Sequence, residues 1–298
     1  MKLQPDIVIS ASRRTDIPAF YMKWFIKHIE KSMFEVKNPY NNKVRFVPAT
    51  PDQVNTIVFW SKNFAPFIDG EFGTYLKKKG YNLFFNFTIN SGSHLLEPHV
   101  PPLDERLSQL NQLCSIFGAS CINLRFDPIC FYTTKQGNLL NNMKDFNKII
   151  KKASQYGTRR CITSFMDHYP KIKKRTSTMD GFAFVDPPSE KKIETLIKME
   201  KTLAQNDIEL FVCCEKNLLD TLPKNSRINK SACIDNNLLS KLYGGNLSLK
   251  KDYGQRVKNG CGCNVSVDIG SYTDHPCYHN CLFCYANPSD NIQAESNL

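Results

Sequence analysis

Short apolar runs alternate along the chain with longer stretches in which apolar residues recur at helical spacing. Short runs bounded by turn residues are typical of buried strands. The expected strands cover residues 7–11, 57–60, 83–89, 121–126, 161–166, 208–214 and 265–269, with a short one near 232–234. The expected helices cover residues 18–29, 103–117, 139–150 and 193–204. A further helical stretch follows Asn63 and ends at Lys79. Because strands that alternate with helices pair in parallel through helical crossovers, the pattern predicts an α/β fold.

Three of the expected strands carry polar residues on one face and apolar residues on the other. The polar residues are Asn86, Thr88 and Asn90, then Asn123, Arg125 and Asp127, and finally Asn264, Ser266 and Asp268. Strands of a doubly wound sheet are covered on both faces and read as continuous apolar runs. The alternation therefore favours a (β/α) barrel of parallel strands, complete, partial or open, with a polar lumen. We expect one domain over residues 1–298, in which 257–298 form a C-terminal segment with a cysteine-rich loop.

A polar lumen has two interpretations, because buried polar groups must find partners either in a ligand or among themselves. We expect a ligand, since ligands of parallel α/β folds bind beyond the carboxyl ends of the strands. The residues expected at that end are Arg13, Arg14, Asp16, Lys62, Asn90, Asp127, Asp167, His168 and Glu215. Arg125, Asp127 and Glu215 are the candidates for catalysis or for contacts with a substrate or a ribose.

The overall composition is that of an ordinary globular protein, with 41% hydrophobic and 22% charged residues among 298. No apolar run approaches the roughly 18 residues of a membrane span. The apolar run near the N-terminus is too short for the core of a signal peptide. We therefore expect a cytoplasmic protein without a membrane partner. In a reducing compartment, 12 cysteines favour metal or redox chemistry over disulfides.

The formal net charge of +11 favours anionic partners, which include nucleic acid, nucleotides and acidic metabolites. Lysines are spread along the whole chain, and the only dense basic run covers residues 171–175 in an expected loop. Such a run is more often a solvated loop than a binding surface. Nucleic acid therefore remains an open partner that the charge alone does not establish.

Three cysteines lie close together near the end of the chain. Cys277, Cys281 and Cys284 have the spacing CxxxCxxC, and Cys261 and Cys263 precede them. Thiolates are soft donors, and three on one loop can reach a single metal centre. An iron–sulfur cluster is the expected occupant. The alternative is a zinc ion, with Cys261 or Cys263 as the fourth ligand, that only ties down the C-terminal segment.

A second group of cysteines is a further candidate metal or cluster site. Its members are Cys213, Cys214, Cys233, Cys261 and Cys263. The alternative is that they are buried apolar side chains at the ends of strands. His275 lies just before the cysteine loop and His279 lies within it. Either could bind the metal, and we interpret them as neighbours of the ligands or as exposed side chains. The cysteines interpreted as core residues are Cys114, Cys121, Cys130 and Cys161.

The loop Cys277-Tyr-His-Asn-Cys281-Leu-Phe-Cys284 resembles the CxxxCxΦC signature of radical S-adenosylmethionine enzymes, with Phe283 at the aromatic position. The resemblance implies a [4Fe–4S] cluster on three thiolates, an open iron chelated by S-adenosylmethionine, and Phe283 near the adenine. It also implies an incomplete (β/α) barrel and reduction by a flavodoxin- or ferredoxin-type protein. A 5′-deoxyadenosyl radical would then abstract hydrogen from a small polar or anionic substrate.

A second resemblance extends over nearly the whole chain. Its motifs are Ser10-Ala-Ser-Arg-Arg-Thr-Asp-Ile-Pro-Ala-Phe, Asn38-Pro-Tyr, Phe59-Trp-Ser-Lys-Asn, Arg125-Phe-Asp-Pro-Ile, Cys261-Gly-Cys, Asp268-Ile-Gly and Cys284-Tyr-Ala-Asn. They look like a bacterial domain-of-unknown-function family, noted for a C-terminal cysteine cluster similar to that of radical S-adenosylmethionine enzymes. This resemblance implies a cysteine-bound centre and no particular reaction.

The cysteine loop follows the last expected strand, whereas in radical S-adenosylmethionine enzymes it follows the first. A permuted strand order reconciles the two, and it predicts that the strand over 265–269 lies beside the strand over 7–11. Arg13, Arg14 and Asp16 would then reach the cofactor, with one arginine in a bidentate pair with its carboxylate. Two other functions stay open: a nucleic-acid- or nucleotide-binding protein with a structural zinc or iron–sulfur site, and an iron–sulfur electron-transfer protein.

Overall fold

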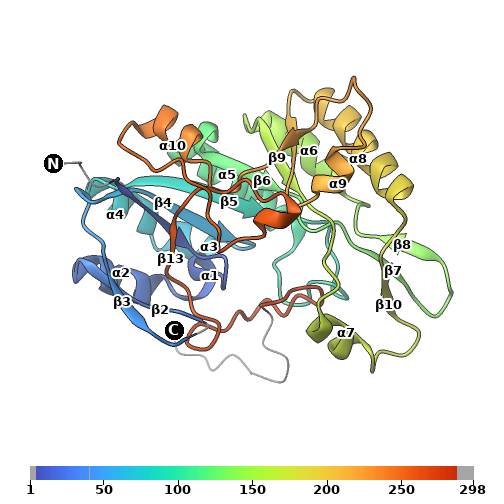
Figure 1. The fold of residues 1–298 in the computed structure, drawn as a ribbon, viewed down its shortest axis with the longest axis horizontal. Coiled ribbons are helices and arrows are strands. Elements are labelled where there is room, and N and C mark those ends of the chain that lie inside the picture. Colours follow the sequence, from blue (N-terminus) through green and yellow to red (C-terminus); the bar gives the residue numbers. More distant parts are fainter. Residues whose placement is uncertain (1–4, 40, 287–298) are drawn as a thin grey trace.

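The computed structural model describes residues 5–39 and 41–286, and its centre is one parallel β-sheet (Figure 1). Eight strands pair in the order β12, β11, β9, β6, β5, β4, β1 and β13, and neighbours in this order are parallel. Their bounds are β1 Ile7–Ala11, β4 Val54–Ser61, β5 Asn82–Thr88, β6 Ile122–Arg125, β9 Arg160–Thr163, β11 Glu209–Val212, β12 Asn229–Lys230 and β13 Val267–Asp268. All but β12 overlap an expected strand, and β12 lies just before the one expected near 232–234.

The sheet is open in the part of the chain that the structure describes. Strands β12 and β13 form its two edges, and each pairs with a single neighbour. Both edge strands are two residues long, so neither presents more than a short ladder to a further strand. The structure confirms a mixed α/β fold with a large parallel sheet, and closure of this sheet into a barrel is not found.

The helices connect the strands of this sheet. Their bounds are α1 Ile17–Phe20, α2 Met22–Glu30, α3 Ala65–Asp69, α4 Phe72–Lys78, α5 Leu103–Phe117, α6 Phe146–Gln155, α7 Pro170–Thr176, α8 Ser189–Ala204, α9 Lys216–Leu219 and α10 Asn236–Tyr243, with 3-10 turns η1 Ala119–Cys121 and η2 Val257–Asn259. The helix expected over 18–29 is interrupted at Tyr21, which lies between α1 and α2. The helix expected over 139–150 begins only at Phe146.

Two small antiparallel sheets, which the sequence pattern did not predict, extend away from the main sheet (Figure 1). Strand β2 Met33–Lys37 pairs with β3 Val44–Pro48. Strand β7 Phe131–Thr133 lies between β10 Ala183–Val185 and β8 Leu139–Asn141. The residues of β8 are exposed. Its leucines therefore do not form the buried helix face that their spacing predicted.

Phenylalanine side chains fill the space between the sheet and α3. Phe59 from β4 and Phe85 from β5 are fully buried, with ring centroids 6.1 Å apart. Phe64 and Phe67, at the start of α3 and within it, meet the Phe85 ring edge to face at 5.6 and 5.7 Å. Burial of each such side chain contributes about 2 kcal/mol, so this layer holds α3 on the sheet.

The polar residues of the central strands form a buried network, which corrects the expectation that they await a ligand. Asn86 Nδ2 donates to the carbonyl of Cys233 at 3.0 Å, and Asn123 Nδ2 donates to Asn86 Oδ1 at 3.1 Å. Arg160 Nε in turn donates to Asn123 Oδ1 at 3.1 Å. Asn86 and Asn123 are at most 1% exposed. These hydrogen bonds satisfy the two buried amides within the protein.

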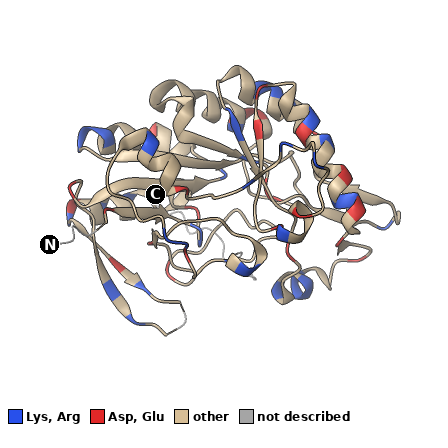
Figure 2. Cartoon of the chain, turned by 45° about the horizontal axis from the view of Figure 1, so that its top comes forward, with Lys and Arg blue, Asp and Glu red and all other residues tan. Residues whose placement is uncertain are grey.

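Basic and acidic residues are interspersed along α8, whereas the charged residues of α7 are all basic (Figure 2). The dense basic run over 171–175 lies on α7, and not in a loop as expected. Within the described ranges, no helix combines the length and the apolar character that crossing a membrane requires.

Candidate metal centres at the carboxyl edge of the sheet

The first and last strands of the main sheet are neighbours. Strand β1 pairs in parallel with β13, with Ile9 opposite Val267 and Ser10 opposite Asp268. This is the pairing that the permuted strand order predicted. Because parallel strands end at the same edge, the segment after β1 and the segment that leads to the cysteine loop leave the sheet side by side.

The carboxylate of Asp268 ties these two segments together. It accepts hydrogen bonds from Ser10 Oγ at 3.0 Å, Ser12 Oγ at 2.5 Å and the Arg13 amide at 2.8 Å. Gly270 permits this close approach, because a Cβ at that position would lie 2.1 Å from Ser12 Oγ. The motifs around Ser12 and Asp268 therefore form one junction between the two ends of the fold.

Asp16 anchors the cysteine loop to the N-terminal segment. Its Oδ1 caps α1 by accepting from the Ala19 amide at 3.0 Å, and its Oδ2 accepts from the Lys62 amide at 2.8 Å. Nε2 of His279, which is 2% exposed, also lies 2.8 Å from Oδ2. Both oxygens of Asp16, expected to reach the cofactor, are thus engaged within the protein, and His279 orients the loop from beside the cysteines.

The three thiols of the cysteine loop lie in a largely buried environment. Cys281 is buried, and Cys277 and Cys284 are half-buried. Burial raises the pKa of the Cys277 and Cys281 thiols, and the nearby charge of Lys62 opposes that rise. Each of these two thiols also interacts with the charge of Cys284. The three sulfurs therefore share one electrostatic environment that contains a cation.

That cation belongs to a buried ion pair. Lys62 Nζ lies 2.5 Å from Glu97 Oε1, and 5.3 Å from the ring centroid of Phe283 in the loop. Asn90 Nδ2 donates to the same Glu97 oxygen at 3.1 Å. Although burial works against it, the charge of Lys62 holds the pKa of Glu97 below its ordinary value. Lys62 favours a thiolate at Cys281, and the carboxylate of its partner Glu97 offsets part of that effect.

The basic run on α7 also contacts the cysteine loop. Arg175 Nη1 donates to the carbonyl oxygens of Leu282 at 2.7 Å and Cys284 at 3.2 Å. The sequence did not single out Arg175 or Glu97 as site residues. The basic run was the only sequence feature that pointed to Arg175. Glu97 lies in a turn-rich stretch that has no motif pointing to a site.

The second group of cysteines comes together from three segments. Cys213 and Cys214 follow β11, Cys233 follows β12, and Cys261 and Cys263 follow η2. They form one cluster with Ile162 and Phe211. Gly262 permits the packing, because a Cβ there would lie 2.5 Å from the carbonyl oxygen of Ser231. The structure thus brings together the cysteines that were expected as a second site.

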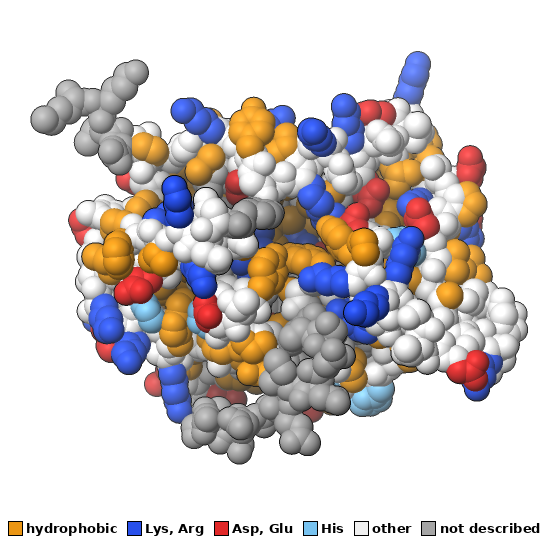
Figure 3. Space-filling view, turned by 60° about the horizontal axis from the view of Figure 1, so that its bottom comes forward, with side chains coloured by type: hydrophobic (Ala, Val, Ile, Leu, Met, Phe, Trp, Pro, Cys, Tyr) orange, Lys and Arg blue, Asp and Glu red, His pale blue; other side chains and the backbone are white. Residues whose placement is uncertain are grey.

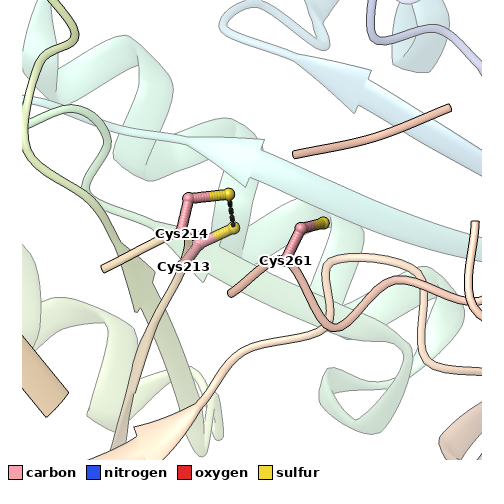
Figure 4. Close-up of side chains that lie close together, drawn as sticks. All are labelled: Cys213, Cys214 and Cys261. Carbon is pink, nitrogen blue, oxygen red and sulfur yellow. Dashed lines mark hydrogen bonds between the residues drawn. The ribbon is translucent and has the colours of Figure 1, made fainter. Parts of the chain in front are cut away.

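Sulfur atoms of this group approach closely enough to bind a metal ion. The Sγ atoms of Cys213, Cys214 and Cys261 all lie within 4.8 Å of one another (Figure 4). Cys213 Sγ is 3.4 Å from that of Cys214 and 3.9 Å from that of Cys233. A tetrahedral zinc ion with Zn–S bonds of about 2.3 Å holds its sulfurs about 3.8 Å apart. Cys213, Cys214 and Cys261 could therefore hold a metal ion.

Arg125, a candidate for substrate contact, is directed at this second group. Its Nη1 donates to Cys233 Sγ at 2.7 Å, and its Nη2 pairs with the carboxylate of Asp127. The guanidinium also lies 5.1 Å from the centroid of the Trp60 ring. Asp127 in addition accepts from Ser164 Oγ at 2.5 Å. Both candidates are thus engaged with protein groups.

The two arginines expected at the cofactor carboxylate point to different partners. Both terminal nitrogens of Arg13 donate to Ser266 Oγ at 3.3 Å, and the guanidinium interacts with the charge of Cys263. Arg14 Nη1 donates to the carbonyl of Gly270 at 2.9 Å. Arg13 therefore lies at the second cysteine group, and Arg14 lies at the junction of β1 and β13.

Glu215 lines a separate cavity of about 380 Å³ together with Asp167, His168 and Cys214. Burial raises the pKa of Glu215 to about 7, and the Phe165 amide donates to its carboxylate at 3.1 Å. Glu215 therefore lines a cavity, whereas the other two candidates, Arg125 and Asp127, pair with each other.

Comparison with known proteins identifies the family of the chain but no curated relative. A family model described as "Domain of unknown function (DUF1848)" matches residues 8–286. No curated protein matches the chain. The matched region contains the β1–β13 junction and both groups of cysteines, and it spans nearly the whole described chain. The chain therefore belongs to this DUF1848 family of domains of unknown function.

Proposed function

We propose that this protein is an iron–sulfur enzyme of the radical S-adenosylmethionine type, with a [4Fe–4S] cluster on Cys277, Cys281 and Cys284. One observation carries the proposal. The three thiols lie on one loop in a shared, largely buried environment, yet among the described residues they are not grouped at the spacing of a single-ion site. A cubane cluster binds each thiolate through a different iron, so it suits three neighbouring thiols that are farther apart than the ligands of one ion.

The surroundings of the loop fit such a cluster. Lys62 favours negative charge on Cys281, an effect that its ion-pair partner Glu97 offsets in part. The Ala286 amide donates to Cys284 Sγ at 3.3 Å, and hydrogen bonds to cluster sulfurs are one means by which proteins tune the reduction potential. Arg175 holds the loop through the carbonyl of Leu282, and the imidazole of His279, within the loop, contacts Asp16.

When bound, the cluster would supply one-electron chemistry to S-adenosylmethionine, and the protein would position and shield the reacting groups. Phe283 is buried beside the thiols, where its ring can pack against an adenine. The face seen in Figure 3 is hollowed near its centre, with hydrophobic and basic side chains around the hollow. Basic groups there favour a small polar or anionic substrate. A flavodoxin- or ferredoxin-type protein in the cytoplasm would be the reductant.

An iron–sulfur electron-transfer protein is the second candidate. Two groups of cysteines at the carboxyl ends of the strands would suit it if both held a cluster. A nucleic-acid partner has weaker support, because Arg175 of the basic run is used to hold the cysteine loop.

Anaerobic purification with iron and sulfide analysis tests the proposal. We expect about four iron and four sulfide per loop cluster, and 5′-deoxyadenosine after addition of dithionite and S-adenosylmethionine. Cys281→Ala should abolish the loop iron and the product. Cys114→Ala, which removes a buried thiol outside both cysteine groups, should retain both.

Three results would count against the enzyme. Zinc in place of iron, lost on replacement of Cys281, would make the loop a structural site. Iron without 5′-deoxyadenosine would favour the electron-transfer protein. Binding of RNA or DNA with a steep dependence on salt would favour the nucleic-acid partner.

A further inference from the structure

The five thiols of Cys213, Cys214, Cys233, Cys261 and Cys263 form a group separate from the cysteine loop. They pack with Ile162 and Phe211, whereas Cys281 and Phe283 of the loop pack in a different cluster with Leu96 and Met166. We propose that this five-thiol group is a second metal centre, which binds one thiophilic divalent ion of the zinc type in a tetrahedral thiolate site. This proposal does not depend on the chemistry of the loop.

Among the five thiols, Cys213 and Cys261 each interact with three of the others. Cys213 interacts with Cys214, Cys233 and Cys261, and Cys261 interacts with Cys213, Cys214 and Cys263. Cys233 and Cys263 interact with each other as well. A tetrahedral ion needs four ligands, so the group offers one donor more than is required. Cys213, Cys214 and Cys261 would supply three ligands, and either Cys233 or Cys263 would supply the fourth.

The compactness of the group favours a single ion over a cubane cluster. The Sγ separations of 3.4 and 3.9 Å, from Cys213 to Cys214 and Cys233, are close to the value of about 3.8 Å between thiolates on one zinc ion. This is the opposite of the arrangement in the cysteine loop, whose thiols do not reach single-ion spacing within the described structure.

Guanidinium groups surround the five thiols. Arg125 Nη1 donates to Cys233 Sγ at 2.7 Å, Arg13 interacts with the charge of Cys263, and Arg256 interacts with that of Cys214. A divalent ion on four thiolates carries a net charge of −2, which is costly to bury without compensating cations. The three arginines provide part of that compensation, because each also pairs with an aspartate: Arg125 with Asp127, Arg13 with Asp252 and Arg256 with Asp167.

Metal binding requires deprotonated thiols, because thiolates are the ligands of the ion. The ion would join the segments after β11, β12 and η2, so it would hold the edge of the sheet to the C-terminal segment.

Metal analysis of a variant that lacks the loop thiols tests the second centre. The full chain with Cys277→Ala, Cys281→Ala and Cys284→Ala should retain about one zinc per chain. After removal of zinc, Co²⁺ should give the intense charge-transfer and visible bands of a tetrahedral thiolate site. Absence of bound metal in this variant would overturn the proposal, and so would stoichiometric iron and sulfide.

Single substitutions in the group test the ligand assignment. Cys213→Ser and Cys261→Ser should abolish zinc binding, whereas Cys233→Ser and Cys263→Ser should weaken it, because each of these two residues can replace the other. Arg125→Gln should weaken zinc binding by about 10- to 100-fold, the usual effect of removing a partner of a metal ligand. Equal zinc content in Cys261→Ser and in the control Cys114→Ser would contradict the assignment.

A measurement on the unsubstituted protein covers variants that fail to fold. Mass spectrometry after alkylation should show the five cysteines protected in the zinc-loaded protein and modified after treatment with a zinc chelator. Modification of Cys114, which is buried elsewhere, reports any general unfolding. If the chelator does not change the alkylation of the five cysteines, burial alone protects them and the metal centre is refuted.

Discussion

Replacement of Asp268 by Ala is expected to destabilise the protein by about 4 kcal/mol, the largest effect we predict outside the cysteines. The substitution leaves the Ser10 and Ser12 hydroxyls and the Arg13 amide without their acceptor. It also removes the acceptor of the Gly270 amide at 3.1 Å. Because these contacts join β1 to β13, the C-terminal segment should detach, and both centres should lose metal.

Urea unfolding of the metal-free protein measures this effect without the contribution of bound metal. Asp268→Asn keeps the size of the side chain and should lie between the native protein and Asp268→Ala. Asp274→Ala changes an exposed aspartate of the same segment and should alter stability by about 0.5 kcal/mol or less. Similar stabilities for Asp268→Ala and Asp274→Ala would show that the junction does not hold the segment.

Replacement of Lys62 by Met is expected to cost about 3 kcal/mol at pH 7, because it leaves the buried carboxylate of Glu97 without its ion-pair partner. Glu97 is 3% exposed, and Arg106 is the cation that remains near it. The double variant Lys62→Met and Glu97→Gln should regain most of the loss, since the glutamine amide needs no counter-charge. Lys62→Met should also reduce the iron retained by the loop.

The pH dependence of stability provides a second test of this pair. In the native protein, the pKa of Glu97 lies below its ordinary value of 4.5, so the pair contributes stability above pH 4.5 that is lost as the pH falls. In Lys62→Met, burial raises the pKa of Glu97, and stability is then lost as the pH rises. The stability difference between the two proteins should therefore be large at pH 7 and small well below pH 4.5. A difference independent of pH would exclude the ion pair as its cause.

The junction of β1 and β13 explains why a cysteine loop at the end of the chain can lie beside the N-terminal segment. Parallel pairing places Ser10 opposite Asp268. Beyond this pair, Ser12 donates to the Asp268 carboxylate, and Asp16 contacts His279 of the cysteine loop. A strand order that joins the first and last strands thus places residues more than 250 positions apart in one site. This arrangement is independent of whether the loop holds iron or zinc.

The sequence by itself determined the alternation of strands and helices and the grouping of the loop thiols. Both depend on neighbours along the chain: apolar periodicity reports which residues are buried in one element, and the spacing of Cys277, Cys281 and Cys284 places three donors on one loop. Helices such as α5 and strands such as β5 were therefore predicted close to their observed bounds.

Apart from the pairing of β1 with β13, which the permuted order predicted, only the tertiary structure decided how the strands are ordered and which polar groups meet. Periodicity does not distinguish an amide that awaits a ligand from one that pairs with another strand, so Asn86 and Asn123 were assigned to a lumen although they bond to each other. In the same way, the sequence named five cysteines as a possible second site, but their sulfur separations depend on three distant segments. Such contacts follow from the order and register of the sheet, which no local pattern encodes.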